Sequence, residues 1–343
     1  MMITLDEAKE LGKGYKVVPI SKEILSDIRT PIEVLRILKG VSRHCYMLES
    51  VEHQERWGRY TFLGYDPKME ITCMNGSLTI RNGSTKTKTV EHPGEGIKEL
   101  LKEYTSPKVE GLPTFTGGLV GYFSYDYVKY SEPKLNLDVE DTEGFKDVDL
   151  MLFDKVIAFD NLRQKIIVIA NARMEDIEAE YTRCTAEIED IIKLIREGIP
   201  TTIEPGRITS DFRALFSEKE YCAMVEKAKK YIYEGDIFQV VLSNRLEADY
   251  EGSLLNTYRH LRTINPSPYM FYFSSDDMEV AGASPETLVK LEDGVLHTFP
   301  LAGTKPRGKT QEEDQELERI LLSDEKENFK AINGVLPEND GAW

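Results

Sequence analysis

Three features are scarce in this sequence: long apolar runs, cysteines and positive charge. The longest apolar run is residues 166–170, far below the roughly 20 residues that a bilayer-spanning helix needs. The first seven residues contain neither the basic nor the apolar segment of a secretion signal, so we expect a cytoplasmic protein. The four cysteines are widely separated, which excludes a disulfide framework and predicts buried thiols. They are Cys45, Cys73, Cys184 and Cys222.

The sequence also has few histidines, and its basic residues are outnumbered by acidic ones. The five histidines have no metal-ligand spacing, and we expect surface or core residues instead of ligands. Acidic residues exceed basic ones by 60 to 43, giving a net charge of −17, which argues against binding to a nucleic-acid backbone. With 41% hydrophobic and 30% charged residues, the composition is that of a folded globular protein.

The length of 343 residues predicts about two domains. Capping and apolar periodicity predict helices after Thr30, over 175–198 and after Ser217. Short β-rich runs separated by turn residues predict hairpins between about residues 59 and 169, and further strands over 237–242 and 270–273. Hairpins mixed with segregated helices, without a βαβ rhythm, predict an α+β fold of mixed sheets and packed helices.

Residues 303–310 satisfy G-x-x-x-x-G-K-S/T, the pattern of a phosphate-binding loop. A nucleotide-binding sheet needs strands and an acidic magnesium ligand after that loop, whereas only 33 residues follow Thr310. Pro306 also removes one amide donor from the proposed loop. We therefore expect an ordinary loop before a helix capped by Thr310 and Glu313.

Seven ordered segments resemble the large subunit of anthranilate synthase (component I), in the family of chorismate-using enzymes. In the first half they are MLES at 47–50, WGRYTFLG at 57–64 and FTGGLVGY at 115–122. In the second half they are GDIFQVVLS at 235–243, NPSPYM at 265–270, GASPE at 282–286 and PLAGTKPRG at 300–308. The resemblance covers roughly residues 10 to 328 and makes coincidence a poor explanation.

The resemblance implies that chorismate and ammonia are converted to anthranilate and pyruvate, with Mg²⁺ holding the substrate carboxylate. Gly303 and Thr304 match family positions that contact chorismate, through a backbone group and a hydroxyl. Ala302 stands where aminodeoxychorismate synthases typically carry a nucleophilic lysine, which favours anthranilate synthase. Two alternatives stay open: a non-catalytic remnant that binds tryptophan or a partner, and another chorismate-using enzyme such as aminodeoxychorismate or isochorismate synthase.

The resemblance also implies regulation and a partner. Five residues match family positions that bind tryptophan as a feedback inhibitor: Glu49, Ser50, Pro268, Tyr269 and Met270. The sequence lacks a cysteine-based glutaminase motif, so the ammonia would come from a glutamine amidotransferase subunit, component II. The ordinary alternative makes Glu49 a solvated charge, Ser50 a strand-end cap and residues 268–270 a turn entering a strand.

The resemblance predicts four regions: an N-terminal region over 10–170, a helix and linker over 171–212, the first part of the chorismate-binding domain over 213–328, and an unrelated tail over 329–343. Lys330 stands where the family has a glutamate that binds magnesium, and the second magnesium ligand has no counterpart. We therefore expect a family member truncated inside its catalytic domain and inactive as printed. The strand over 270–273 is expected to lose its neighbours and present an open edge.

Overall fold

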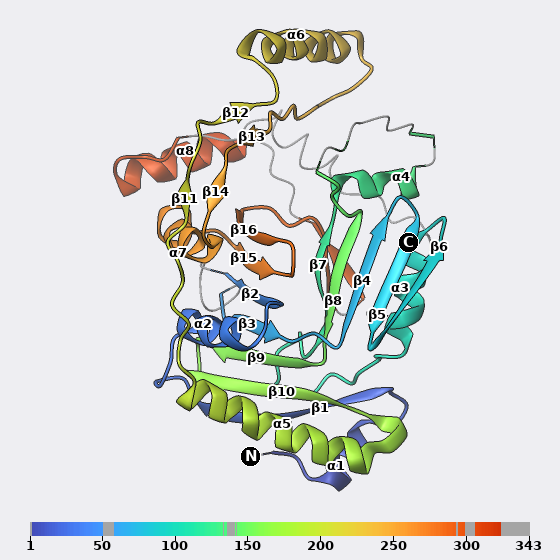
Figure 1. Cartoon of the computed structure of the whole chain (residues 1–343). Coiled ribbons are helices and arrows are strands. Elements are labelled where there is room, and N and C mark those ends of the chain that lie inside the picture. The colour runs from blue at the N-terminus through green and yellow to red at the C-terminus, as the bar shows by residue number, and fades with distance from the viewer. Residues whose placement is uncertain are drawn as a thin grey trace.

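Two antiparallel sheets lie face to face, and helices cover their outer surfaces (Figure 1). The structure is a computed structural model, and it describes residues 2–50, 58–132, 134–135, 141, 143–292, 294–298 and 306–323. Antiparallel sheets with segregated helices confirm the predicted α+β class. Among the described residues, no helix is both long and apolar enough to cross a membrane.

The larger sheet has seven strands. The last two in spatial order lie more than 200 residues later in the sequence than the strand that precedes them in the sheet. Every pairing in it is antiparallel. In spatial order the strands are β1 (Val17–Leu25), β10 (Lys165–Arg173), β9 (Lys155–Asp160), β3 (Tyr60–Tyr65), β2 (Cys45–Glu49), β15 (Tyr269–Ser274) and β16 (Glu279–Ser284).

The smaller sheet has five strands, and short connections link it to the larger one: residues 66–68 between β3 and β4, and the single residue Asp154 between β8 and β9. The turns at Asn75-Gly76 and Asn82-Gly83 confirm the predicted hairpins, since both glycines and Asn75 have the positive φ that tight hairpin turns require. In spatial order the strands are β6 (Ser84–Thr89), β5 (Ser77–Asn82), β4 (Met69–Met74), β8 (Val148–Phe153) and β7 (Gly118–Phe123).

The main core lies between the larger sheet and four helices. Apolar residues on one face of each helix pack against alternate strand residues, including Met47, Met270 and Tyr272. Thr30 caps its helix, as its sequence predicts, and the structure adds the reciprocal contact with Glu33 that completes a capping box. The helices are α1 (Leu5–Leu11), α2 (Pro31–Val41), α5 (Ile177–Glu197), which follows the short helix η2 (Met174–Asp176), and α7 (Leu254–Ile264).

A second core lies on the outer face of the smaller sheet, and a third lies between the two sheets. The outer core packs under α3 (Pro93–Lys102), η1 (Tyr125–Tyr127) and α4 (Val128–Ser131). Between the sheets, the rings of Tyr46 and Phe153 meet edge to face with centroids 4.7 Å apart. The inner faces of both sheets are therefore apolar.

The helix after Ser217 extends away from both sheets in Figure 1. It is α6 (Glu218–Glu234), and it has no buried residue, so Cys222 is exposed; the expectation of a buried thiol is wrong there, whereas the other three cysteines are buried. Two pairs of two-residue strands, one further hairpin and the helix capped by Thr310 complete the described chain. They are β11 (Arg207–Ile208) with β14 (Tyr250–Glu251), β12 (Arg213–Ala214) with β13 (Leu246–Glu247), β17 (Lys290–Glu292) with β18 (Val295–His297), and α8 (Gln311–Ser323).

Two strand expectations are wrong. Residues 237–242 form no strand, because no other described strand pairs with them, and Phe238 is 96% exposed. The strand over 270–273 keeps a neighbour on each side instead of losing them, since β15 lies between β2 and β16. Part of the region assigned to the second domain therefore completes a sheet of the first, and the division at 171–212 stays a prediction.

Asp147 predicts how the stability of the smaller sheet depends on pH. Its buried carboxylate accepts hydrogen bonds of 2.7 Å from the Lys129 ammonium, the Tyr130 hydroxyl and the backbone N–H of Asn75. Burial alone would raise the pKa of Asp147, but these donors together lower it below its ordinary value. The stabilisation is thus present above the unfolded-state pKa of about 4 and is lost as the pH falls through the lower folded-state value.

We expect Asp147→Asn to lower the midpoint of urea unfolding at pH 7, and the difference from the wild type to shrink below about pH 4. Urea titrations followed by circular dichroism between pH 2.5 and 7 measure this. The exposed Asp27→Asn change serves as the control and should have little effect throughout. A difference that stays constant across this range would contradict the role of the charged carboxylate.

Candidate functional site

Strands β2 and β15 bring together residues that lie more than 200 positions apart in the sequence. Met270 is directly opposite Glu49, and Phe271 is opposite Leu48. Directly opposite residues share a face of the sheet, and successive residues alternate between faces. Glu49 and Met270 therefore face the helices, whereas Leu48 and Phe271 face the smaller sheet.

Glu49 is held by two side chains of α7. It is 9% exposed, accepts a 2.6 Å hydrogen bond from the Tyr258 hydroxyl, and forms an ion pair with Arg262, whose Nη2 donates to Oε2 at 2.8 Å. Burial and the neighbouring carboxylate raise the pKa of Tyr258, so its hydroxyl stays protonated and donates. Glu49 thus fixes α7 against the end of β2.

Ser50, which follows β2, has a buried hydroxyl with no hydrogen-bond partner among the described residues. The alternation along β2 places its side chain on the same face as Leu48. Tyr269 shares this face through its spacing from Phe271, and its hydroxyl lies 2.5 Å from that of Thr287. A buried hydroxyl without a partner is costly, and a polar ligand group is one way to satisfy it.

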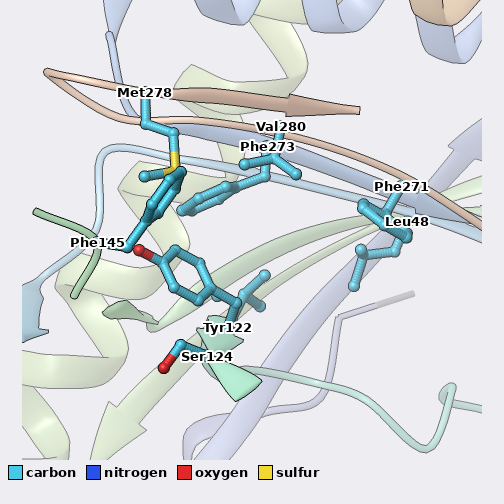
Figure 2. Close-up of a pocket in the computed structure, with 10 residues that line it drawn as sticks. Leu48, Tyr122, Ser124, Phe145, Phe271, Phe273, Met278 and Val280 are labelled. Carbon is cyan, nitrogen blue, oxygen red and sulfur yellow. The ribbon is translucent and has the colours of Figure 1, made fainter. Parts of the chain in front are cut away.

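A cavity of about 510 Å³ lies between the sheets, close to this strand pair (Figure 2). The Tyr122 and Ser124 side-chain oxygens are buried, and neither has a hydrogen-bond partner in the part of the chain that the structure describes. Burial and nearby Asp149 raise the pKa of Tyr122 to about 12, so the hydroxyl remains neutral. The remaining lining is mainly apolar: Leu48, Val120, Gly121, Phe145, Phe271, Phe273, Met278 and Val280. This composition suits a flat apolar ring with a few polar groups.

A second cavity, of about 660 Å³, opens on the same face of the larger sheet and is more polar. Tyr269, Phe62 and Arg59 are among the residues that line it, and Arg59 forms an ion pair of 2.8 Å with Asp160. The two cavities flank the end of β2, because Leu48, which lines the first, is paired with Phe62, which lines the second.

The structure describes the five residues matched to a tryptophan site but not those matched to the chorismate site. Gly303 and Thr304 lie outside the described residues, as do Ala302 and Lys330. The contacts of Tyr258 and Arg262 with Glu49 could not be predicted, because nothing in the sequence indicates which helix covers β2. The alternation of Tyr269, Phe271 and Phe273 was the available signal for an aromatic wall.

Comparison with known proteins identifies the family. Residues 43–329 match the family model described as chorismate binding enzyme. Anthranilate synthase component 1 of Aquifex aeolicus is 40% identical to this chain, and the match covers 98% of this chain and 69% of that protein. The protein of the same name from Acetivibrio thermocellus is 38% identical, and the match covers 94% of this chain and 67% of that protein. The chain therefore spans about two thirds of the length of these relatives.

Solved structures agree with this assignment. The crystal structure of anthranilate synthase component I from Streptococcus pneumoniae covers 90% of this chain with a TM-score of 0.67 and 31% identity, the match spanning 66% of that structure. The menaquinone-specific isochorismate synthase MenF of Escherichia coli shares the fold, with a TM-score of 0.57 and 16% identity over 96% of this chain and 66% of its own. The chain belongs to the family of chorismate binding enzymes and is a homologue of anthranilate synthase component 1.

Proposed function

We propose that this chain serves as the large subunit of anthranilate synthase, the enzyme that converts chorismate and ammonia to anthranilate and pyruvate. Its relatives carry that name at 38–40% identity. The structural observation that carries the proposal is the pairing of β2 with β15, which places Glu49 beside Met270 and Ser50 near Tyr269. These residues come from two of the motifs that distinguish the large subunit.

Chorismate is a dianion, so its site must offer hydrogen-bond donors and positive charge. We assign one contact to a backbone group of Gly303 and another to the Thr304 hydroxyl. Mg²⁺ would supply a charge that holds a substrate carboxylate. Lys330, at a position where the family has a carboxylate ligand, offers a cation in its place, and we derive no step through the metal.

Ammonia would be delivered by a glutamine amidotransferase subunit. The relatives are named component 1, which implies a component 2, and the present sequence shows no cysteine-based glutaminase motif. The division of labour is chemical: one subunit releases ammonia from glutamine, and this one adds it to the chorismate ring.

Tryptophan is the inhibitor that we propose for the cavity between the sheets. An indole ring would pack between Leu48 and Phe271 on one side and Val120 on the other. The buried hydroxyls of Tyr122 and Ser124, which line this cavity, would meet the polar atoms of the ligand, and the buried hydroxyl of Ser50 lies two residues after Leu48 on the same face of the sheet. Glu49 faces the helices, so we assign it a positioning role, in which it holds the end of β2 through Tyr258 and Arg262. A ligand in this cavity would touch both sheets and could thus favour one relative position of them.

The proposal is tested by titrating the purified chain with L-tryptophan in a calorimeter. We expect saturable binding, and we expect Ser124→Ala to weaken it about tenfold, since Ser124 lines the cavity with a buried, unpaired hydroxyl and one hydrogen bond contributes about 1–1.5 kcal/mol. Ser106→Ala is a matched control: this hydroxyl is also buried without a described partner, but Ser106 lines neither cavity. It should leave the affinity unchanged.

The same titration with chorismate distinguishes the alternatives. Binding of both ligands supports an anthranilate synthase subunit. Binding of tryptophan alone would favour a non-catalytic tryptophan-binding remnant, and binding of chorismate alone would favour another chorismate-using enzyme. Absence of both would overturn the proposal.

A further inference from the structure

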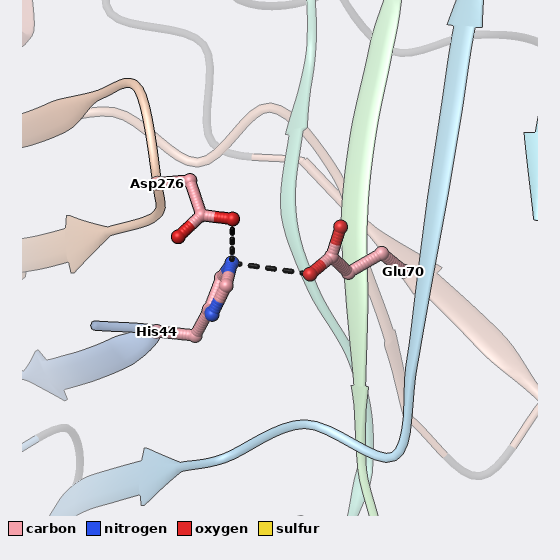
Figure 3. Close-up of side chains that lie close together, drawn as sticks. All are labelled: His44, Glu70 and Asp276. Atoms are coloured by element: carbon pink, nitrogen blue, oxygen red, sulfur yellow. Dashed lines mark ion pairs between the residues drawn. The ribbon is translucent and has the colours of Figure 1, made fainter. Parts of the chain in front are cut away.

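Three potential metal ligands from separate parts of the chain meet at the edge of the space between the sheets (Figure 3). His44 immediately precedes β2 in the larger sheet, Glu70 lies on β4 in the smaller sheet, and Asp276 lies in the turn between β15 and β16. The ligand atoms of all three lie within 4.8 Å of one another. The His44 and Glu70 side chains are mostly buried, at 17% and 23% exposure, whereas that of Asp276 is 58% exposed.

Both carboxylates present one oxygen to the imidazole and the other to an arginine. Nε2 of His44 lies 3.1 Å from Oε1 of Glu70 and 3.7 Å from Oδ2 of Asp276. Arg81 contacts the second oxygen of Glu70 at 3.3 Å, and Arg43 lies 3.9 Å from the second oxygen of Asp276. Each arginine thus neutralises its carboxylate from the far side and leaves the nearer oxygen directed at Nε2.

The two separations from Nε2 are close to those of a tetrahedral metal site. Zinc binds histidine nitrogen and carboxylate oxygen at about 2.0–2.2 Å, so neighbouring ligand atoms around it are roughly 3.3–3.5 Å apart. The two distances from Nε2 lie on either side of that value. The two carboxylate oxygens lie within 4.8 Å of each other, and the Asp276 side chain, which is 58% exposed, has room to approach the other two ligands.

The local charge also favours a cation. The residues around His44 form a rim at this edge of the two sheets. In it, the four carboxylates of Glu70, Asp276, Asp149 and Asp277 lie near three cationic side chains, those of Arg43, Arg81 and Lys146. Lys146 pairs with Asp149 at 2.9 Å and Asp277 at 3.3 Å. A neutral imidazole therefore leaves the rim with one excess negative charge, which a divalent ion would reverse.

We propose that His44, Glu70 and Asp276 form a binding site for Zn²⁺ or a similar divalent transition-metal ion. One nitrogen and two oxygens from the protein, with water in the fourth position, make up the coordination. The ion would connect strand β4 of the smaller sheet to two loop residues of the larger sheet, His44 before β2 and Asp276 between β15 and β16, and would thus hold the two sheets together at this edge. Met278, two residues after Asp276, lines the cavity between the sheets, so the ion also restrains one wall of that cavity.

The test is calorimetric titration of the metal-free protein with ZnCl₂ alone, with Co²⁺ absorption as a probe of tetrahedral geometry. We expect one ion per chain, and we expect His44→Ala and Asp276→Asn each to weaken binding at least about tenfold. Asp276 is exposed, so its variant should fold even if that of His44 does not. The control is Asp277→Asn, which alters the adjacent carboxylate, the one that faces Lys146, and should leave zinc affinity within about twofold.

Thermal unfolding supplies a second readout, since a ligand that binds only the folded state raises the melting temperature with its concentration. Zinc should raise the melting temperature of the wild type and the Asp277→Asn variant equally, and at the same zinc concentration it should raise that of Asp276→Asn by less. Failure of the wild type to bind zinc would overturn the proposal, as would equal losses in Asp276→Asn and Asp277→Asn. In either case the cluster would be only an ion pair between an imidazole and two carboxylates.

Discussion

Replacing Gly121 with alanine should unfold the edge of the smaller sheet and abolish ligand binding in the cavity between the sheets. Gly121 lies on β7 opposite Leu150 and has a φ of 155°. A Cβ at this position would lie 1.9 Å from the carbonyl oxygen of Asp149. Backbone cannot yield as the end of a flexible side chain can, so the strands must separate.

We expect Gly121→Ala to lower the free energy of unfolding by at least about 4 kcal/mol, because a single substitution loses that much stability only through a few severe effects, among them steric clash and backbone strain. Gly118→Ala provides the control within the same strand. Gly118 also has a positive φ, of 142°, but its added Cβ would meet only the ring of Phe115, at 3.5 Å. Backbone strain alone, of order 1 kcal/mol, should be its cost.

Urea unfolding of the three proteins, with L-tryptophan titrations of each, measures both effects. If the two alanine variants were equally destabilised, the positive φ and not the contact with Asp149 would explain why glycine is needed. Retention of a folded Gly121→Ala protein with an intact cavity would contradict the strand separation argued here.

Arg262→Ala should have the second largest effect, because it leaves the Glu49 carboxylate buried with Tyr258 as its remaining described side-chain partner. Removing one partner of a fully buried pair costs about 3–5 kcal/mol. The Arg262 side chain is 30% exposed, so solvent screens part of the interaction, and we expect about 2–3 kcal/mol. Chemical denaturation at neutral pH measures the loss.

The double variant Glu49→Gln with Arg262→Ala should recover part of that stability, because an uncharged amide is less costly to bury than an unpaired carboxylate. Arg259→Ala is the control on the same helix: this residue is exposed, its Nη1 donates to the Asn256 side chain at 3.0 Å, and its loss should cost under about 0.5 kcal/mol. If the double variant were less stable than Arg262→Ala, burial of an unpaired charge could not explain the effect.

Local signals in the sequence predicted local structure well. The capping boxes at Thr30 and Ser217 and the asparagine-glycine turns depend on residues within a few positions of one another, and the structure has all of them. The α+β class followed from the same signals. The predicted strand over 237–242 failed because apolar residues favour a strand only where a partner strand is available.

Long-range placement could not be predicted in this way. Only the family resemblance suggested that Glu49 and Ser50 lie near Tyr269, and it did not suggest that Glu49 would face α7. The cluster of His44, Glu70 and Asp276 has no characteristic spacing, because its members lie on three strand ends more than 20 residues apart. Such a site exists only after the two sheets have packed.

The pairing of β2 with β15 also determines when this protein can finish folding on the ribosome. About 220 residues separate Glu49 from Tyr269, and ribosomes add about 5–20 residues per second. The inner edge of β2 therefore waits about 10–45 seconds for its partner strand to be synthesised. During that interval an edge containing Tyr46, Met47 and Leu48 has no partner strand, and it is open to pairing with other nascent chains until residue 274 has emerged.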